Sequence, residues 1–274
     1  MIDYLDILIL CACGIAGGFL SGLLGVGGGI AYVVFISFYL QKLGVNDYLF
    51  VPAVIANSMF CIFFAGLSGS IKQYLNQNFH PKPILITGLA STFAAIFFSY
   101  SITHWLDYNR GNFTFIFILL LLFIAIIMLL KRDKENKLEE KPIKNTSIKF
   151  LGIGILSGSL AAFSGIGGGI IMMPLFTNTL SMNIKKANAV SLGVITLMAF
   201  LTSIYNMILN PAYLDLPYSI GLISLQISLP IAIFSVIAAP FGVSLASKLK
   251  PNTIRIIFVL FILAVIIRMV SGYF

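Results

Sequence analysis

One glycine-rich segment occurs twice in this chain. The first copy, residues 14–30, reads GIAGGFLSGLLGVGGGI, and the second, residues 154–170, reads GILSGSLAAFSGIGGGI. The glycines at 14, 18, 25, 27, 28 and 29 all recur in the second copy at a constant offset. Further along, VIANSM at 54–59 can be aligned with ANAVSL at 187–192, which pairs Ser58 with Ser191. Chance does not produce such a match, so the chain is an internal duplication.

Apolar stretches of membrane-spanning length fill both copies. Hydrophobic residues make up 59% of the chain and charged residues only 9%, whereas soluble domains carry about 25% charged residues. A helix needs about 20 apolar residues to span the hydrocarbon core of a bilayer. Such runs occur at 47–71, 83–106, 112–130, 184–209, 217–247 and 253–271. We therefore predict an all-α integral membrane protein.

Two longer apolar stretches, 4–40 and 149–180, are each interrupted by a glycine segment. Between the two halves, KRDKENKLEEKPIKNTSIK at 131–149 is the only sustained polar stretch. The sequence thus predicts a first transmembrane repeat at 1–130, a cytoplasmic linker at 131–149 and a second transmembrane repeat at 150–274. Each repeat consists of a glycine-broken segment followed by three transmembrane helices.

The distribution of lysine and arginine indicates how the two repeats are oriented. If both repeats pointed the same way, several lysines would lie outside the cell, against the positive-inside rule. If each broken segment instead enters and leaves on one side, as two half-helices of about 15 residues, each repeat crosses three times and the second is inverted. Most basic residues then lie inside, with Lys42 and Arg268 as exceptions. We predict a multi-pass protein of the cell membrane with two inverted repeats.

Three consecutive glycines lie near the end of each glycine segment. Glycine weakens a helix by about 1 kcal/mol relative to alanine, so the helix is expected to break there. A broken backbone in lipid is tolerated only where it is buried in protein or lines a cavity. The restarting helices would direct free N–H groups and positive dipole ends into the protein, which suits an anion. The predicted substrate-binding residues at the breaks are Gly25, Gly27, Gly28, Gly29, Gly165, Gly167, Gly168 and Gly169.

Polar side chains inside the predicted spans are few, and none is acidic at mid-span, where a cation site would be expected to show one. The further candidate substrate-binding residues are Asn57, Ser58, Ser191 and Gln226. Each has an alternative structural role, because serine often bonds to its own helix and glutamine to a neighbouring one. The stripe of Gly14, Gly18 and Gly22 on one helix face could equally serve close helix packing.

The motifs resemble the TauE/SafE sulfite exporter family, also called the toluene-sulfonate uptake permeases. The matching stretches are GGFLSGLLGVGGGI at 17–30, GSLAAFSGIGGGIIMMPLF at 158–176 and KKANAVSLGVIT at 185–196. The last is similar to the family's Ala-x-Gly-Thr-Ser-Leu pattern, with Ala189 and Val190 in place of Gly and Thr. The resemblance covers nearly the whole chain. It implies transport of sulfur oxyanions or organosulfonates such as sulfite, sulfoacetate or thiosulfate.

The predicted partners are a small anionic substrate and the lipid bilayer, without nucleic acid. The net charge of +8 is explained by cytoplasmic loops. Cys11, Cys13 and Cys61 lie in apolar stretches without metal-ligand spacing, so neither a metal nor another cofactor is predicted. These cysteines are either small buried hydrophobes or thiols that meet a sulfur-containing substrate.

Two other functions remain open on the sequence. An anion channel could use the same helix N-termini, since weak binding permits conduction. An intramembrane serine protease is suggested by GLSG at 66–69, with Ser68 as nucleophile and His80 or His104 as base. Import is not distinguished from export, and no mid-span carboxylate or histidine offers a proton relay.

Overall fold

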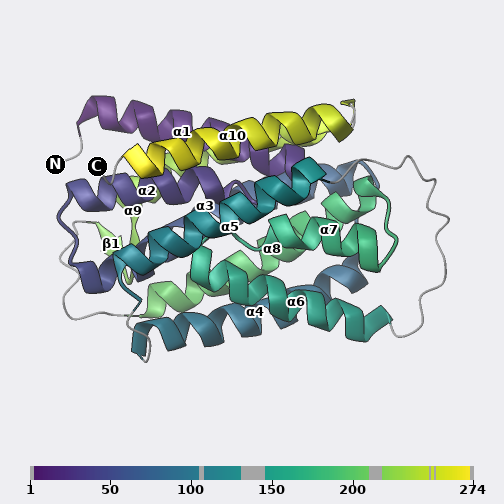
Figure 1. Ribbon diagram of the computed structural model, residues 1–274, viewed down its shortest axis with the longest axis horizontal. Helices are drawn as coiled ribbons and strands as arrows, with labels where there is room; N and C mark the ends of the chain where they lie inside the picture. Colours follow the sequence, from purple (N-terminus) through teal and green to yellow (C-terminus); the bar gives the residue numbers. More distant parts are fainter. Residues whose placement is uncertain are drawn as a thin grey trace.

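The protein is a bundle of helices that run roughly along its long axis (Figure 1). The computed structural model describes residues 3–104, 108–130, 146–209, 218–246, 248–249 and 251–271. The first half contains α1 (Tyr4–Leu24), α2 (Gly29–Lys42), α3 (Asp47–Leu75), α4 (Pro81–His104) and α5 (Arg110–Leu130). The second half contains α6 (Thr146–Ser164), α7 (Gly169–Thr179), α8 (Ile184–Ile208), β1 (Ser219–Ile220), β2 (Ile223–Ser224), α9 (Leu225–Ala246) and α10 (Pro251–Ser271).

Six helices among the described residues are long and apolar enough to cross a membrane: α1, α3, α4, α6, α8 and α9. The prediction of an all-α membrane protein is therefore confirmed, with only the two-stranded hairpin β1–β2 as sheet in the described part of the chain. The linker predicted at 131–149 lies largely outside the described residues, and α6 begins at Thr146.

Each glycine-broken segment folds back on itself, so that its two ends lie together. At the open end of the first hairpin, Lys42 of α2 pairs with the Asp6 carboxylate of α1, with 2.7 Å between Nζ and Oδ2. Tyr39 donates to the Asp6 carbonyl at 3.3 Å. In the second hairpin, the rings of Phe150 and Phe176 are 6.1 Å apart. Both broken segments therefore begin and end on the same side.

The two arms of each hairpin differ in length, contrary to the expectation of two half-helices of similar size. In the first hairpin, α1 has 21 residues and α2 has 14. In the second, α6 has 19 residues and α7 has 11. The leading arm is thus long enough to span a membrane by itself. The reason is that apolar residues precede the glycine break for about five turns, whereas polar loop residues follow the second arm sooner.

Helices α3 and α8 form the buried centre of the bundle and run in opposite directions. Gln73 near the end of α3 bonds Asn188 near the start of α8, at 3.2 Å. Towards the other end, the rings of Phe63 and Phe200 are 5.1 Å apart. The two central helices, which carry the matching serines Ser58 and Ser191, therefore run antiparallel.

The glycine stripes let helices of one half lie against helices of the other. A Cβ on Gly22 of α1 would lie 2.0 Å from the Ala239 carbonyl oxygen of α9. A Cβ on Gly158 of α6 would lie 2.1 Å from the Ser91 carbonyl oxygen of α4. Backbones approach this closely only where no side chain intervenes, so the stripes are packing surfaces.

Candidate functional site

The glycine breaks adopt one backbone geometry in both halves. Gly25 ends α1 and Gly165 ends α6, both in the left-handed conformation with φ of 68°. Gly28 and Gly168 precede α2 and α7 with φ of 70° and 69°. A Cβ on Gly28 would lie 2.3 Å from the Gly17 carbonyl oxygen. Both the φ values and this close approach require glycine, which is why the motif recurs without change.

The two breaks, far apart in the sequence, meet in the centre of the protein. A Cβ on Gly29 would lie 2.5 Å from the Ile166 carbonyl oxygen, and one on Gly169 would lie 2.7 Å from the Gly25 carbonyl oxygen. All residues from Gly25 to Ile30 and from Gly165 to Ile170 are buried. The structure therefore brings the eight predicted glycines into one site, closed to solvent.

One serine bonds each break to the central helix of the opposite half. Ser58 of α3 donates its hydroxyl hydrogen to the Gly165 carbonyl at 2.7 Å. Ser191 of α8 donates to the Gly25 carbonyl, also at 2.7 Å. The weak sequence match that paired these serines is therefore confirmed, and both lie at the predicted site.

The starts of α2 and α7 supply the donors of this site. The first backbone bonds of α2 run from the Ala31 and Tyr32 N–H groups to the Gly28 carbonyl, at 3.1 and 3.4 Å. In α7, Ile171 and Met172 bond the Gly168 carbonyl in the same way, at 3.2 and 3.3 Å. The N–H groups just before these residues are the donors that a helix start leaves without an intrahelical partner. Since no charged residue is buried at the breaks, backbone groups define their electrostatics.

Asn57 has a different place from the one expected of a substrate-binding residue. Its amide nitrogen donates to the carbonyls of Ala53 at 2.8 Å and Leu222 at 3.0 Å. Its amide oxygen accepts from the Ser224 N–H at 2.8 Å and the Ser228 hydroxyl at 3.0 Å. Because all four positions of the amide are used within the protein, Asn57 holds the β1–β2 hairpin against α3.

Gln226 is the second residue of α9 and is half-buried beside the β1–β2 hairpin. The expectation placed it inside an apolar span. It lies at the start of the helix instead, since α9 begins at Leu225. Gln226 and Asn57 are thus the two predicted site residues that have no hydrogen bond to the breaks among the described residues.

Three buried polar residues near the ends of the two central helices were missed from the sequence. Gln73 and Asn188 bond each other, and Asn188 also reaches the Leu23 carbonyl at 3.4 Å. Asn206, near the end of α8, is only 1% exposed. Asn188 and Asn206 are polar residues inside an apolar helix, a signal that usually marks a functional or packing role in membrane proteins.

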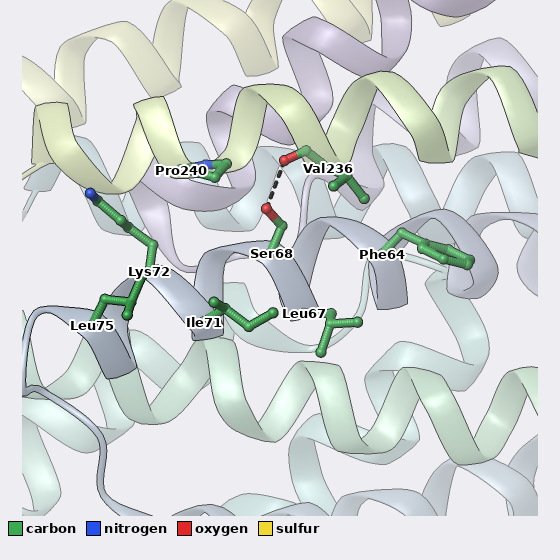
Figure 2. Close-up of a pocket in the computed structure, with 8 residues that line it drawn as sticks. All are labelled: Phe64, Leu67, Ser68, Ile71, Lys72, Leu75, Val236 and Pro240. Atoms are coloured by element: carbon green, nitrogen blue, oxygen red, sulfur yellow. Dashed lines mark hydrogen bonds between the residues drawn. The ribbon is translucent and has the colours of Figure 1, made fainter.

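Ser68, the candidate protease nucleophile, lies in a groove of about 200 Å³ between α3 and α9. Figure 2 shows its side chain directed at Val236, whose carbonyl accepts the Ser68 hydroxyl hydrogen at 2.6 Å. Pro240 has no N–H to donate to that carbonyl, so the serine replaces a missing bond of α9. The Ser68 hydroxyl thus has a structural contact within the helix pair.

The two buried cysteines also make contacts within the protein. Cys13 points at the Ala31 carbonyl, with 3.8 Å between sulfur and oxygen. Cys61 points at the Ser228 carbonyl at 3.5 Å. Cys11 is half-buried, and all three thiols are free. Cys61 lies one turn from Ser58 on α3, so it is the cysteine nearest to the breaks along that helix.

A bundle of apolar helices with two matching halves, joined through broken helices at its centre, is the architecture of a membrane transporter. The family model of the sulfite exporter TauE/SafE matches residues 10–269, so the chain belongs to this family. A probable membrane transporter protein of Methanocaldococcus jannaschii is 26% identical over 255 residues, covering 90% of this chain and 89% of the relative. A probable membrane transporter protein of Haemophilus influenzae is 26% identical over 269 residues, covering 96% of this chain and 97% of the relative. No solved structure matches the chain significantly.

Proposed function

We propose that this transporter carries small anions, most of all sulfur oxyanions or organosulfonates such as sulfite, sulfoacetate or thiosulfate, through the paired glycine breaks. The observation that carries the proposal is the meeting of the two breaks, with the start of α2 beside Ile166 and the start of α7 beside Gly25, all of them buried. Helix N-termini bind anions through free N–H groups and the positive end of the dipole. A sulfur oxyanion offers several acceptor oxygens to such donors.

The ionic character of the buried residues agrees with an anionic substrate. Among the described residues, Asp6 is the one buried carboxylate, and it lies at the open end of the first hairpin, paired with Lys42. It is therefore remote from the breaks along α1. A cation site would be expected to place acidic residues at depth.

The orientation that we propose puts the linker 131–149 in the cytoplasm of a cell-membrane protein with inverted repeats. Asn78 donates to the Lys185 carbonyl at 3.1 Å, so the α3–α4 loop lies beside the start of α8. This end carries the basic residues Lys72, Lys82, Lys185 and Lys186. The opposite end carries Asp6 and Asp47 together with Lys42 and Arg110. The excess of lysine favours the first end as cytoplasmic.

A carrier is preferred to an anion channel because every residue of both breaks is buried. A channel would need a continuous path in its conducting state, whereas a carrier exposes its site to each side in turn. Counterflow separates the two: a carrier preloaded with sulfite accumulates labelled sulfite transiently, and a channel does not.

The proposal is tested by uptake of sulfite and thiosulfate, beside chloride, into liposomes that contain the purified protein. Saturable uptake of a sulfur oxyanion is expected for the wild type. Gly29→Ala should reduce the maximal rate at least tenfold, because its Cβ would push against the Ile166 carbonyl where the breaks meet. Gly152→Ala is the matched control, since a Cβ there meets nothing within 4 Å.

Size-exclusion chromatography checks that both variants are folded. Normal uptake by folded Gly29→Ala would show that the breaks are packing devices. Absence of uptake for every sulfur oxyanion in the wild type would remove the proposed substrate class. For the wild type, a rise in thermal midpoint with sulfite but not with chloride provides a second readout that needs no variant.

A further inference from the structure

The two faces of the central site are closed by different side chains, although the backbone is duplicated. Ser58 corresponds to Ser191, and Ile62 corresponds to Ile195, which together flank Gly27 and Gly167. The same sequence spacing pairs Gln73 with Asn206 and Asn188 with Ile55. The glycines agree with this pairing, because a Cβ on Gly25 would meet Asn188 and one on Gly165 would meet Ile55.

On the face towards the linker, the polar side chains are bonded to one another. Gln73 donates to Asn188 at 3.2 Å, and Asn188 donates to the Leu23 carbonyl at 3.4 Å. Asn78 donates to Gln73 at 3.2 Å. A chain of hydrogen bonds thus joins α3, α8 and the end of α1 and closes this face.

On the opposite face, the corresponding bond cannot form. Asn206 takes the place of Gln73, but Ile55 stands where Asn188 would accept its hydrogen bond. The Asn206 amide nitrogen is buried and has no hydrogen-bond partner within the described residues. The hydroxyl of Ser224, which is 1% exposed, is also without a partner there. An unpaired buried donor costs about 1 to 3 kcal/mol, so a ligand that accepts hydrogen bonds from Asn206 and Ser224 would be stabilised by them.

The β1–β2 hairpin carries Ser224 and is bonded to the backbone of Asn206. The Leu222 N–H donates to the Asn206 carbonyl at 3.1 Å, and the Leu222 carbonyl accepts from Asn57 at 3.0 Å. Ser224 bonds the Asn57 amide oxygen through its N–H. Leu222, Ile223 and Ser224 are all buried. The hairpin therefore lies against α3 and α8, bonded to the Asn57 side chain and to the Asn206 carbonyl, with Leu222 and Ile223 in an apolar cluster.

The hairpin reaches close to the depth of the breaks. Asn57 lies in the eleventh position of α3, about 15 Å from the start of that helix. Its neighbour Ser58 bonds the Gly165 carbonyl of the break. Of these two adjacent residues of α3, Asn57 thus bonds the hairpin and Ser58 bonds the break of the opposite half. The first half has no such element, since a loop of five residues joins α3 to α4.

We propose that Asn206 and Ser224 form an outer subsite for the oxyanion, covered by the β1–β2 hairpin, which Asn57 holds as a gate. The inference rests on the proposed function and adds a side-chain site beside its backbone site. When the hairpin leaves Asn57, the amide N–H of Asn206 and the hydroxyl of Ser224 donate to the oxyanion on its way to the breaks. No charged group is needed, because an oxyanion accepts from neutral N–H and O–H donors.

The test is sulfite uptake by Asn206→Leu in liposomes. Loss of a binding donor should raise the KM for sulfite at least tenfold with little change in the maximal rate. The thermal midpoint should stay equal or rise, since the lost amide nitrogen makes no bond in the closed protein. Thr202→Val is the matched control on the same helix, because its hydroxyl bonds its own helix at the Met198 carbonyl.

An unchanged KM in Asn206→Leu, or an equal rise in Thr202→Val, would overturn the subsite and leave the proposed function standing. Absence of sulfur-oxyanion uptake in the wild type would overturn both. The gate has its own readout: in a background without native cysteines, a membrane-impermeant thiol reagent should label Ser224→Cys at least tenfold faster after Asn57→Asp. Equal labelling rates would show that Asn57 does not hold the hairpin.

Discussion

The side chains of Ser58 and Ser191 join the two halves of the protein at its centre by hydrogen bonds. Each hydroxyl bonds the last carbonyl of a broken helix from the opposite half, at 2.7 Å. Such a carbonyl has no partner within its own helix, because helix ends leave their final acceptors unsatisfied. Each serine therefore stabilises a backbone group that lipid could not satisfy.

Replacing either serine by alanine is expected to lower stability by a similar amount. Ser58→Ala and Ser191→Ala each leave a buried carbonyl unpaired, at a cost of about 1 to 3 kcal/mol. Thermal unfolding in detergent measures the effect. Ser101→Ala should change the midpoint little, because its hydroxyl bonds the Phe97 carbonyl within α4. A lower thermal midpoint in only one of the two variants, Ser58→Ala or Ser191→Ala, would mean that the two breaks are not equivalent.

At the scale of elements, the glycine stripes determine which helices pair. Gly14, Gly18 and Gly22 of α1 lie on α9, and Gly154 and Gly158 of α6 lie on α4. The stripe on α1 thus packs against α9 of the second half, and the stripe on α6 packs against α4 of the first half. Small residues permit this because van der Waals contact between backbones drives helix association in lipid.

Two alanine substitutions within α6 should have opposite effects. Gly158→Ala would place a Cβ 2.1 Å from the Ser91 carbonyl oxygen and force α6 away from α4. Overpacking of this kind costs about 1 to 3 kcal/mol. Gly152→Ala meets nothing within 4 Å and should raise helix stability by up to about 1 kcal/mol. Thermal midpoints of the two variants provide the comparison, and equal midpoints would contradict the packing role of the stripe.

At the scale of the whole molecule, the antiparallel course of α3 and α8 relates the two halves. Both hairpins begin and end on one side. The β1–β2 hairpin breaks this relation, because it lies on one face alone within the described residues.

Labelling of single cysteines in intact cells checks this arrangement. In a background without native cysteines, a membrane-impermeant thiol reagent should reach Asp47→Cys, at the start of α3, from outside. It should reach Ile184→Cys, at the start of α8, only after the cells are permeabilised. Both starting positions are exposed. Labelling of both variants from the same side would exclude inverted repeats.

The amino-acid sequence by itself determined the class of protein, the duplication and the positions of the breaks. Membrane insertion follows from composition, and a run of three glycines interrupts a helix wherever it is placed, so both are local properties of the chain. Most helix bounds agreed with the apolar runs for the same reason, but α9 begins at Leu225, well inside the run 217–247. The unequal arms of the hairpins were not predicted, because helix ends depend on loop and packing contacts as well as on apolarity.

Only the tertiary structure decided which groups meet. The bonds from Ser58 to Gly165 and from Asn57 to Leu222 each join residues more than a hundred positions apart. Spacing along one helix says nothing about such partners. Adjacent residues on α3 face different neighbours, so Ser58 lies at the breaks while Asn57 holds a hairpin that no apolar pattern indicated. Asn206 became a candidate only when its counterpart Gln73 was seen with a partner and Asn206 without one.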